Sequence, residues 1–180
     1  MPIAFVTGNE GKAREAAAHL PASVTVTAVD YDYTEIQHPE LATIARHGVR
    51  DAHAALEYDE VLVGDAGLFV DGLGGFPGPY SAYVEDTVGI EGIWRLAREL
   101  EDRTARFETV LAYTDGTVTE TFAGTVEGTI VAPRGEGGFG YDPIFAHDGT
   151  TMAEMTTDEK NAVSHRGRAL EAFAAWYTAQ

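Results

Sequence analysis

Short apolar runs alternate with helical periodicity at the start of the chain. Residues 3–6 are a continuous apolar run, a helical stretch follows the next loop as far as Leu20, and residues 24–29 form a second, mostly apolar run. Short runs of this kind, bounded by turn residues, are typical of buried strands. The pattern predicts a strand, a loop, a helix and a second strand, in that order.

Three further stretches have the spacing of amphipathic helices. The apolar face of the first consists of Leu41, Ile44, Ala45, Gly48, Ala52 and Leu56. The apolar face of the second consists of Ile93, Leu96, Ala97 and Leu100. A closing helix is predicted to begin at the cap Ser164 and to bury Leu170, Phe173, Ala174 and Tyr177. Apolar residues three or four positions apart share one side of a helix, so each stretch is expected to cover a core.

The remaining apolar segments predict strands. Residues 61–63 and 68–70 are interpreted as two short buried strands, and residues 107–113 alternate along a third. Asp115-Gly116 predicts a two-residue hairpin turn before a return strand over residues 118–131. Together these elements predict a single α/β domain over residues 1–180, with a mixed central sheet flanked by helices and two lobes around a substrate cleft.

The charge balance is strongly acidic. The 29 acidic and 12 basic residues give a formal net charge of −17, while 44% hydrophobic residues supply a core and argue against disorder. Self-repulsion of this size opposes compaction unless salt screens it, so the composition indicates a salt-rich cytoplasm of the halophilic archaeal type. The chain lacks the positive stripe that binds phosphate backbones, so nucleic acid is not an expected partner.

Two absences narrow the range of chemistry. The chain has no cysteine, which excludes disulfides, thiolate catalysis and cysteine-ligated zinc. No run approaches the ~18 apolar residues of a membrane span, so a cytoplasmic protein without a membrane partner is expected.

The first loop has the features of a phosphate site. It reads Thr7-Gly8-Asn9-Glu10-Gly11-Lys12, between a strand and a helix. A helix N-terminus presents backbone N–H groups to an anion, and Lys12 adds a full charge. It is not a Walker A loop, because the glycine spacing differs and Ala13 follows the lysine. The alternative is an ordinary helix capped by Asn9, with Lys12 in solvent.

Two acidic positions are candidates for a metal site. Glu35 follows the second predicted strand, and Asp65 lies between an apolar run and glycine. Carboxylate oxygens suit Mg²⁺, which binds together with substrate phosphates. Either residue could instead be a surface carboxylate, as is expected for Asp71. Arg46, on the helix after Glu35, is a further phosphate candidate.

Two segments could bind a nucleoside. Phe139, Gly140, Tyr141 and Asp142 combine aromatic faces for stacking with a carboxylate that can accept a hydrogen bond from a ring N–H. The second segment contains Lys160, one of only two lysines in the chain, and His165 and Arg166 in the first turn of the closing helix. The alternatives are aromatics packed in a core and a solvated His-Arg pair.

The ordered set of motifs resembles the inosine triphosphate pyrophosphatase family. It consists of Thr7 to Lys12, then residues 72–82 (GLGGFPGPYSA), 130–135 (IVAPRG), 139–143 (FGYDP) and 160–170 (KNAVSHRGRAL). The resemblance covers almost the whole chain. It implies a homodimer that uses Mg²⁺ to hydrolyse deaminated purine nucleoside triphosphates, such as ITP, dITP and XTP, to the monophosphate and pyrophosphate.

Carried onto this sequence, the resemblance implies a role for each motif. Residues 7–12 and Ala66 would bind substrate, Glu35 and Asp65 would hold magnesium, and Asp65 would activate water. Residues 139–142, Lys160, His165 and Arg166 would hold the base and sugar.

Two departures leave alternatives open. The family usually has a second acidic residue before the aspartate and a hydroxyl residue after it, where this chain has Gly64 and Ala66. A nucleotide-binding protein that has lost catalysis is therefore one alternative. A pyrophosphatase for modified pyrimidine triphosphates is another, although the aromatic and Ser-His-Arg segments match the purine group.

The acidic composition predicts that the folded state depends on salt. Moving the protein from molar KCl to about 0.1 M lengthens the Debye length from about 3 Å to about 10 Å and restores the self-repulsion. We expect a lower melting temperature at the lower salt concentration, measured by circular dichroism or calorimetry. An unchanged melting temperature would remove the argument for adaptation to salt.

Overall fold

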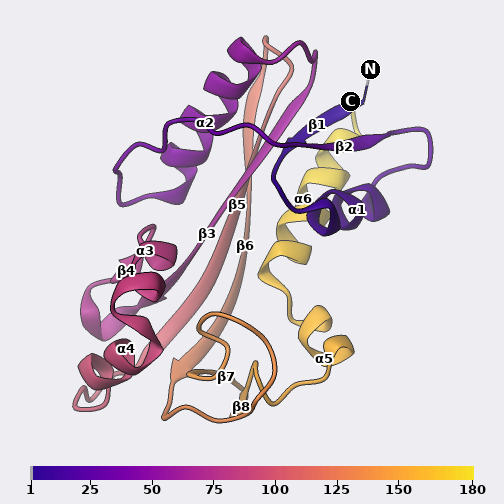
Figure 1. The fold of residues 1–180 in the computed structure, drawn as a ribbon. Coiled ribbons are helices and arrows are strands. Elements are labelled where there is room, and N and C mark those ends of the chain that lie inside the picture. Colours follow the sequence, from indigo (N-terminus) through magenta and orange to yellow (C-terminus); the bar gives the residue numbers. More distant parts are fainter. Residues whose placement is uncertain (1) are drawn as a thin grey trace. The chain divides into compact units, whose positions relative to one another are not determined.

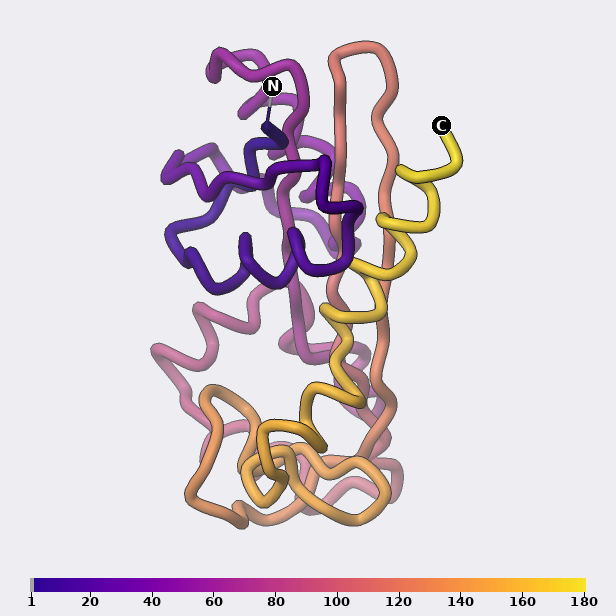
Figure 2. Tube along the Cα trace, turned by 90° about the vertical axis from the view of Figure 1, so that its right-hand side faces the viewer, coloured from indigo at the N-terminus to yellow at the C-terminus, as the bar shows by residue number. Residues whose placement is uncertain are grey.

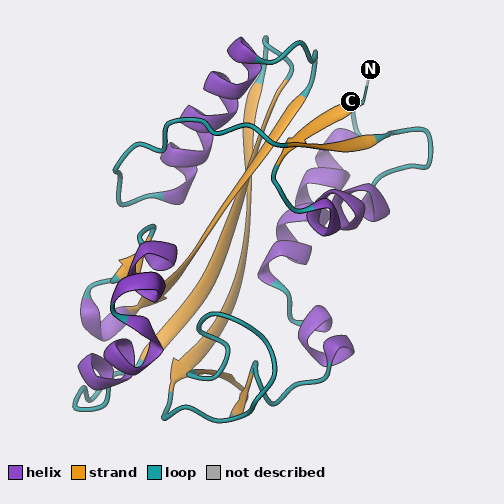
Figure 3. Ribbon diagram, viewed as in Figure 1, coloured by secondary structure: helices purple, strands orange, loops and turns teal. Residues whose placement is uncertain are grey.

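The computed structural model describes residues 2–180. Its strands are β1 (Ile3–Val6), β2 (Val26–Val29), β3 (Val61–Val70), β4 (Pro77–Gly78), β5 (Thr104–Thr114), β6 (Thr119–Ile130), β7 (Phe145–His147) and β8 (Thr150–Thr151). Its helices are α1 (Glu10–His19), α2 (Leu41–Ala55), the 3-10 turn η1 (Asp71–Leu73), α3 (Ser81–Thr87), α4 (Gly89–Ala97), α5 (Thr157–Ala162) and α6 (His165–Tyr177). Figure 3 shows helices and strands in separate colours, with loop between β2 and α2 and between β6 and β7.

The strands form one mixed sheet. Its hydrogen-bonded order is β2-β1-β3-β5-β6-β7-β8, and β4 pairs with β3 beside this path (Figure 1). β1 runs parallel to both β2 and β3, whereas β3–β4, β6–β7 and β7–β8 are antiparallel. The prediction of an α/β fold with a mixed sheet flanked by helices is confirmed.

The chain divides into two compact units. Unit 1 contains the residues up to Asp65, with Thr109–Gly124 and Arg168–Gln180. Unit 2 contains Ala66–Glu108 and Thr125–Gly167. Strands β3, β5 and β6 and helix α6 each contribute residues to both units.

Unit 1 has helices on both faces of its strands. Ile3 and Phe5 of β1 belong to a buried cluster with α1 and α6, whereas the alternate residues Ala4 and Val6 are buried outside that cluster. Figure 1 shows α2 on one side of these strands and α1 with α6 on the other. Burial on both faces explains why residues 3–6 are continuously apolar.

Aromatic contacts hold α6 against the hairpin formed by β5 and β6 in unit 1. Phe173 of α6 lies 5.6 Å from Tyr113 and 5.4 Å from Phe122, measured between ring centroids. The hydroxyl of Tyr113 donates to the carboxylate of Glu60, which also accepts a 3.0 Å hydrogen bond from the hydroxyl of Tyr177. Figure 2 shows the C-terminal helix running beside the hairpin.

In unit 2, a serine joins β3 to β4 and α3. The Ser81 hydroxyl accepts a 2.8 Å hydrogen bond from the Leu68 N–H and donates to the Gly78 carbonyl at 2.6 Å. Gly78 has a φ of 54°, and its carbonyl lies where a Cβ on Gly67 would be placed. The conformation at Gly78 and the close backbone approach both favour glycine, which accounts for part of the glycine-rich motif around residue 75.

Three details of the predicted elements are wrong. The two short strands expected at residues 61–63 and 68–70 are one strand, β3, whose middle is only partly buried. The hairpin between β5 and β6 has a four-residue loop in place of a two-residue turn, because the Asp115 side chain accepts from the N–H groups of Thr117 and Val118. Leu96 is 50% exposed and does not belong to the buried face of α4.

None of the helices within residues 2–180 is long and apolar enough to cross a membrane.

Candidate active site

The first loop joins β1 to α1 and satisfies part of its own hydrogen bonding. Asn9 caps α1, and its side chain accepts a 2.8 Å hydrogen bond from the Gly11 N–H. The Asn9 N–H donates to the Thr7 hydroxyl at 3.1 Å, and the Lys12 N–H donates to the Asn9 carbonyl at 3.0 Å. Fewer N–H groups are therefore free than the loop sequence implied.

The donors that remain point to an anion. Within residues 2–180, the backbone N–H groups of Gly8 and Glu10 have no hydrogen-bond partner, and Lys12 lies in the first turn of α1. Unpaired N–H groups at a helix start, where the helix dipole is positive, suit a phosphate group. The loop therefore combines an Asn9-capped helix with two N–H groups that could meet an anion, and its role in phosphate binding stays a prediction.

The register of two parallel strands sets the position of Asp65. Val6 of β1 pairs with Val63 of β3, where their recorded pairing ends. Continuing this register places Thr7 level with Gly64 and Gly8 level with Asp65. Asp65 itself is half-buried in the middle of β3, not in a break between strands. The phosphate loop and the aspartate therefore lie at the same end of the β1–β3 pairing.

Tyr33 connects the two candidate metal ligands. Its ring packs so closely on Gly48 of α2 that a Cβ there would overlap it. Burial raises the pKa of the Tyr33 hydroxyl, and the negative charges of Glu35 and Asp65 raise that pKa further. The charges of both carboxylates thus reach the same phenol, and whether Glu35 and Asp65 share one metal ion stays a prediction.

These residues fit a magnesium ion that is held mainly by substrate. No group of three or more His, Asp or Glu side chains within residues 2–180 is arranged to hold a metal. Mg²⁺ commonly keeps several waters and takes only one or two protein carboxylates together with substrate phosphates. Glu35 and Asp65 are the two carboxylates expected to take that role, with Gly64 and Ala66 on either side of Asp65.

Unit 2 brings the second lysine to the aromatic segment. The Lys160 ammonium forms an ion pair with Oδ2 of Asp142 and lies 4.3 Å from the ring centroid of Phe139. The same Asp142 oxygen accepts a 2.8 Å hydrogen bond from the Phe139 N–H. Asp142 is buried, whereas Phe139 is 75% exposed. One carboxylate therefore fixes the lysine and closes the loop that presents the aromatic ring.

The two aromatics of this segment differ in role. Tyr141 is only 4% exposed, and its hydroxyl donates to the Ser81 carbonyl at 2.7 Å. Its ring is part of the core of unit 2, so Phe139 is the aromatic of this segment whose ring is exposed enough to stack on a base. Gly140, between them, has a φ of 60°, a conformation that favours glycine.

His165 begins α6 beside this group. Its imidazole stacks on Phe107, with ring centroids 5.3 Å apart and planes inclined by 23°. Burial lowers the pKa of His165 to about 4, and the positive charges of Arg166 and Lys160 contribute. The ring is therefore neutral near pH 7, with one nitrogen to donate and one to accept. Arg166 is half-buried in the same helical turn. Ala66, another predicted substrate-binding residue, is exposed on β3.

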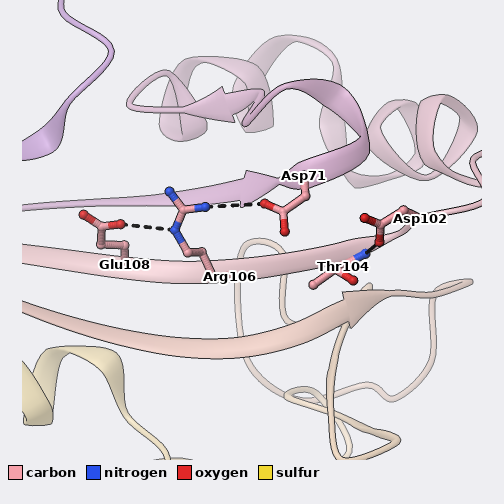
Figure 4. Close-up of polar contacts among 5 residues, drawn as sticks. All are labelled: Asp71, Asp102, Thr104, Arg106 and Glu108. Carbon is pink, nitrogen blue, oxygen red and sulfur yellow. Dashed lines mark hydrogen bonds and ion pairs between the residues drawn. The ribbon is translucent and has the colours of Figure 1, made fainter.

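The structure corrects the expectation for Asp71. Its carboxylate pairs with the Arg106 guanidinium at 3.5 Å and is 47% exposed, so it is not simply solvated. Arg106 also bonds Glu108 at 3.3 Å and lies over the Phe69 ring at 4.4 Å. Figure 4 shows Arg106 between the two carboxylates. Asp71 is consequently a poor reference for a neutral carboxylate substitution.

Two residues that position the site are not evident from the motifs. Phe107 stacks on the candidate residue His165, and the Tyr33 ring packs on Gly48 of α2; each contact joins separate segments of the chain. The only local signal was an aromatic residue two positions before Glu35. Contacts of this kind depend on tertiary structure, which hydrophobic periodicity does not specify.

Known proteins share both this fold and the sequence. A solved structure of the Ham1 protein of Staphylococcus aureus matches with a TM-score of 0.90 and 30% identity, covering 99% of both chains. The fold is therefore the α/β fold of Ham1 proteins. A model of the Ham1 family matches residues 3–176, and the chain belongs to that family.

Two archaeal relatives are more similar in sequence. A dITP/XTP pyrophosphatase of Thermococcus kodakarensis is 47% identical over 180 residues, which cover 98% of this chain and 97% of the relative. A dITP/XTP pyrophosphatase of Methanopyrus kandleri is 48% identical over 182 residues, covering 98% and 96%. These matches confirm the resemblance that the ordered motifs indicated.

The environment of His165 predicts a pH effect on stability. The folded state keeps this ring neutral down to about pH 4, whereas an unfolded chain takes up a proton below about 6.5. The unfolded state binds more protons in that window. The free energy of unfolding therefore decreases, by at most about 3 kcal/mol, as pH falls from 6.5 toward 4. We expect the His165→Gln variant to lose stability less steeply over this range in thermal melts. Parallel pH profiles of the two proteins would contradict the assignment.

Proposed function

We propose that this protein hydrolyses deaminated purine nucleoside triphosphates, such as ITP, dITP and XTP, to the monophosphate and pyrophosphate. The observation that carries the proposal is the Lys160 ammonium, held by buried Asp142 beside exposed Phe139. The names of the archaeal relatives support the same substrate class.

The donor at Lys160 is suited to a 6-oxo purine. Phe139 offers an exposed face for stacking on the base, and the ammonium beside it can donate to the O6 carbonyl. Adenine has an amino group at that position. The amino group and the ammonium are both hydrogen-bond donors, so they cannot pair with each other. Leaving such a group unpaired is costly, so a site of this kind selects against adenine nucleotides. Direct contact between the second oxygen of Asp142 and the ring N–H remains a prediction.

Residues of unit 1 suit the triphosphate. The N–H groups of Gly8 and Glu10 and the ammonium of Lys12 supply donors, while Glu35 and Asp65 would hold magnesium. Magnesium, when bound, neutralises phosphate charge and polarises the phosphoanhydride. The donors of the loop hold the phosphates in position.

Asp65 is the best placed general base. It is half-buried at the level of the phosphate loop, near Glu35 and the Tyr33 phenol. Its carboxylate would take a proton from the attacking water as the water oxygen bonds to phosphorus and the α–β phosphoanhydride breaks, releasing pyrophosphate. General base catalysis of this kind contributes about 10²–10⁴-fold.

We further propose that the enzyme depends on Mg²⁺ and works as a homodimer in the cytoplasm. The carboxylate pair supports the metal, the family resemblance supports the dimer, and the acidic composition supports a salt-rich cytoplasm.

A panel of substrates tests the proposed function. We expect magnesium-dependent release of pyrophosphate from ITP, dITP and XTP, with much slower turnover of ATP and of modified pyrimidine triphosphates. The donor mismatch at adenine predicts a preference of at least about 10²-fold in kcat/KM. Binding of ITP without turnover would identify a protein that has lost catalysis, and preference for pyrimidines would overturn the assignment of unit 2.

Replacing the proposed base should abolish most of the activity. Asp65→Asn removes the proton acceptor and weakens the metal ligand while nearly preserving shape. We therefore expect kcat for ITP to fall at least about 10²-fold, with nucleotide binding largely retained.

Asp59→Asn is the matched control, because Asp59 is exposed and has no ion pair or side-chain hydrogen bond within residues 2–180. Its kcat should stay within about twofold of that of the parent protein, because a substitution at the surface usually has little effect. If folded Asp65→Asn turns over ITP as well as this control does, another group activates the water.

A further inference from the structure

A cavity of about 520 Å³ lies along helix α2 in unit 1. It is lined by Ile36, Thr43, Arg46, His47, Arg50 and Asp51. Two arginines and a histidine in one cavity are notable in a chain with 12 basic and 29 acidic residues. The cavity is positively charged, since Asp51 offsets only one of the two guanidinium groups.

Helix geometry places the two arginines on the side of α2 opposite to Gly48, while Ile36 of the cavity wall directly follows Glu35. Successive residues of an α-helix are turned by about 100°, so Arg46 and Arg50, two positions either side of Gly48, project from the side opposite to it. Gly48 is buried against the Tyr33 ring, whereas Arg46 and Arg50 are exposed. The Tyr33 ring thus packs on the side of α2 that faces away from the two arginines.

The two arginines lack carboxylate partners. Arg46 donates through Nη2 to the Thr121 hydroxyl at 3.1 Å, and Arg50 donates through Nε to the Thr119 hydroxyl at a long 3.5 Å. Within residues 2–180, neither guanidinium takes part in an ion pair, although several other arginines do. The neutral threonines on β6 orient the two positive groups without cancelling their charge.

Most donors of this pair remain available. Each guanidinium has five N–H donors and uses one of them on threonine. Side chains four residues apart on a helix lie on one face, so both forks can reach the same group. Paired arginine forks match the oxygens of a phosphate group, and the His47 imidazole on the same face offers another donor.

The acidic residue of the cavity faces a different partner. The Asp51 carboxylate accepts a 3.1 Å hydrogen bond from the Tyr31 hydroxyl, in the segment between β2 and α2. This bond holds Asp51 toward that segment, while the threonine contacts hold Arg46 and Arg50 toward β6. The arginine side of the cavity is therefore the side that would receive an anion.

We propose that the outward face of α2 is a second anion site, in which Arg46 and Arg50, with His47, bind a phosphate group separately from the triphosphate loop. The group could come from free pyrophosphate, the product of the proposed reaction, or from the terminal phosphates of a nucleotide. Arg46 is thereby assigned to this site and not to the catalytic triphosphate. The assignment rests on the cavity and its contacts and does not require that the proposed reaction occurs.

Binding of inorganic pyrophosphate tests this site in the absence of turnover. Calorimetric titration at the salt concentration that keeps the protein folded should give two pyrophosphates per chain, one at each site. Lys12→Ala should remove the loop site and leave one. Arg50→Gln keeps a hydrogen-bonding side chain for Thr119 but removes the charge, and in the Lys12→Ala background it should weaken the remaining site at least about tenfold.

Arg95→Gln in the Lys12→Ala background is the matched control. Arg95 lies on exposed α4 in unit 2, so the substitution makes the same change in net charge away from the cavity. Equal pyrophosphate binding by the Arg50→Gln and Arg95→Gln proteins would overturn the proposal. So would a single pyrophosphate per chain that both Lys12→Ala and Arg50→Gln weaken, since α2 would then serve the catalytic phosphates.

A competition experiment with a nucleotide identifies the source of the phosphate group. In the Lys12→Ala protein, ATP that displaces pyrophosphate in an Arg50-dependent manner supports the site and shows that nucleotide phosphates also enter it. Failure of ATP to displace pyrophosphate supports a site for the free anion. Neither result depends on hydrolysis of ITP, so failure of the proposed reaction would be seen separately, in the substrate panel.

Discussion

The parallel register between β1 and β3 is the constraint on which the reactive part of unit 1 depends. Pairing of Val6 with Val63 brings the first loop and Asp65 to the same level. A slip of one residue would turn every side chain of the strand to the other face. The register is held by burial on both faces of β1, where Ile3 and Phe5 pack toward α1 and α6. The position of the aspartate is thus a consequence of core packing.

In unit 2, the corresponding constraint is the one that holds the Lys160 ammonium in place within a strongly acidic chain. Asp142 fixes Lys160 and at the same time ties down the backbone of Phe139. Gly138 has a φ of 75°, and a Cβ there would overlap the Asp142 side chain. Glycine at position 138 is therefore required by the close approach of this carboxylate. The loop is ordered by one buried acid, which positions both the ammonium and the exposed ring.

Local patterns predicted the elements of the fold but not the contacts between them. The strand at residues 3–6, the buried face of α2 and the Ser164 cap depend on nearby residues, and all three are observed. The continuous course of β3 was missed because its neighbours in the sheet, β1 and β5, are distant in sequence. The position of the Tyr141 ring in the core was likewise not evident from the motif, since it follows from its burial and from its bond to the Ser81 carbonyl. The residues at the candidate site followed from motifs, whereas Tyr33, Phe107 and the threonine contacts of α2 required the fold.

The net charge of −17 also bears on how an anionic substrate can bind at all. At low salt the field of the whole chain would oppose a triphosphate, since fields of one sign extend over a Debye length of about 10 Å at 0.1 M. In molar salt that length is about 3 Å, so charges beyond direct contact hardly act on the ligand. Binding would then depend on donors that touch the phosphates, which we propose are the N–H groups of the first loop and the ammonium of Lys12. A few well-placed cations can therefore suffice, and the remaining acidic surface does not prevent an anion from binding.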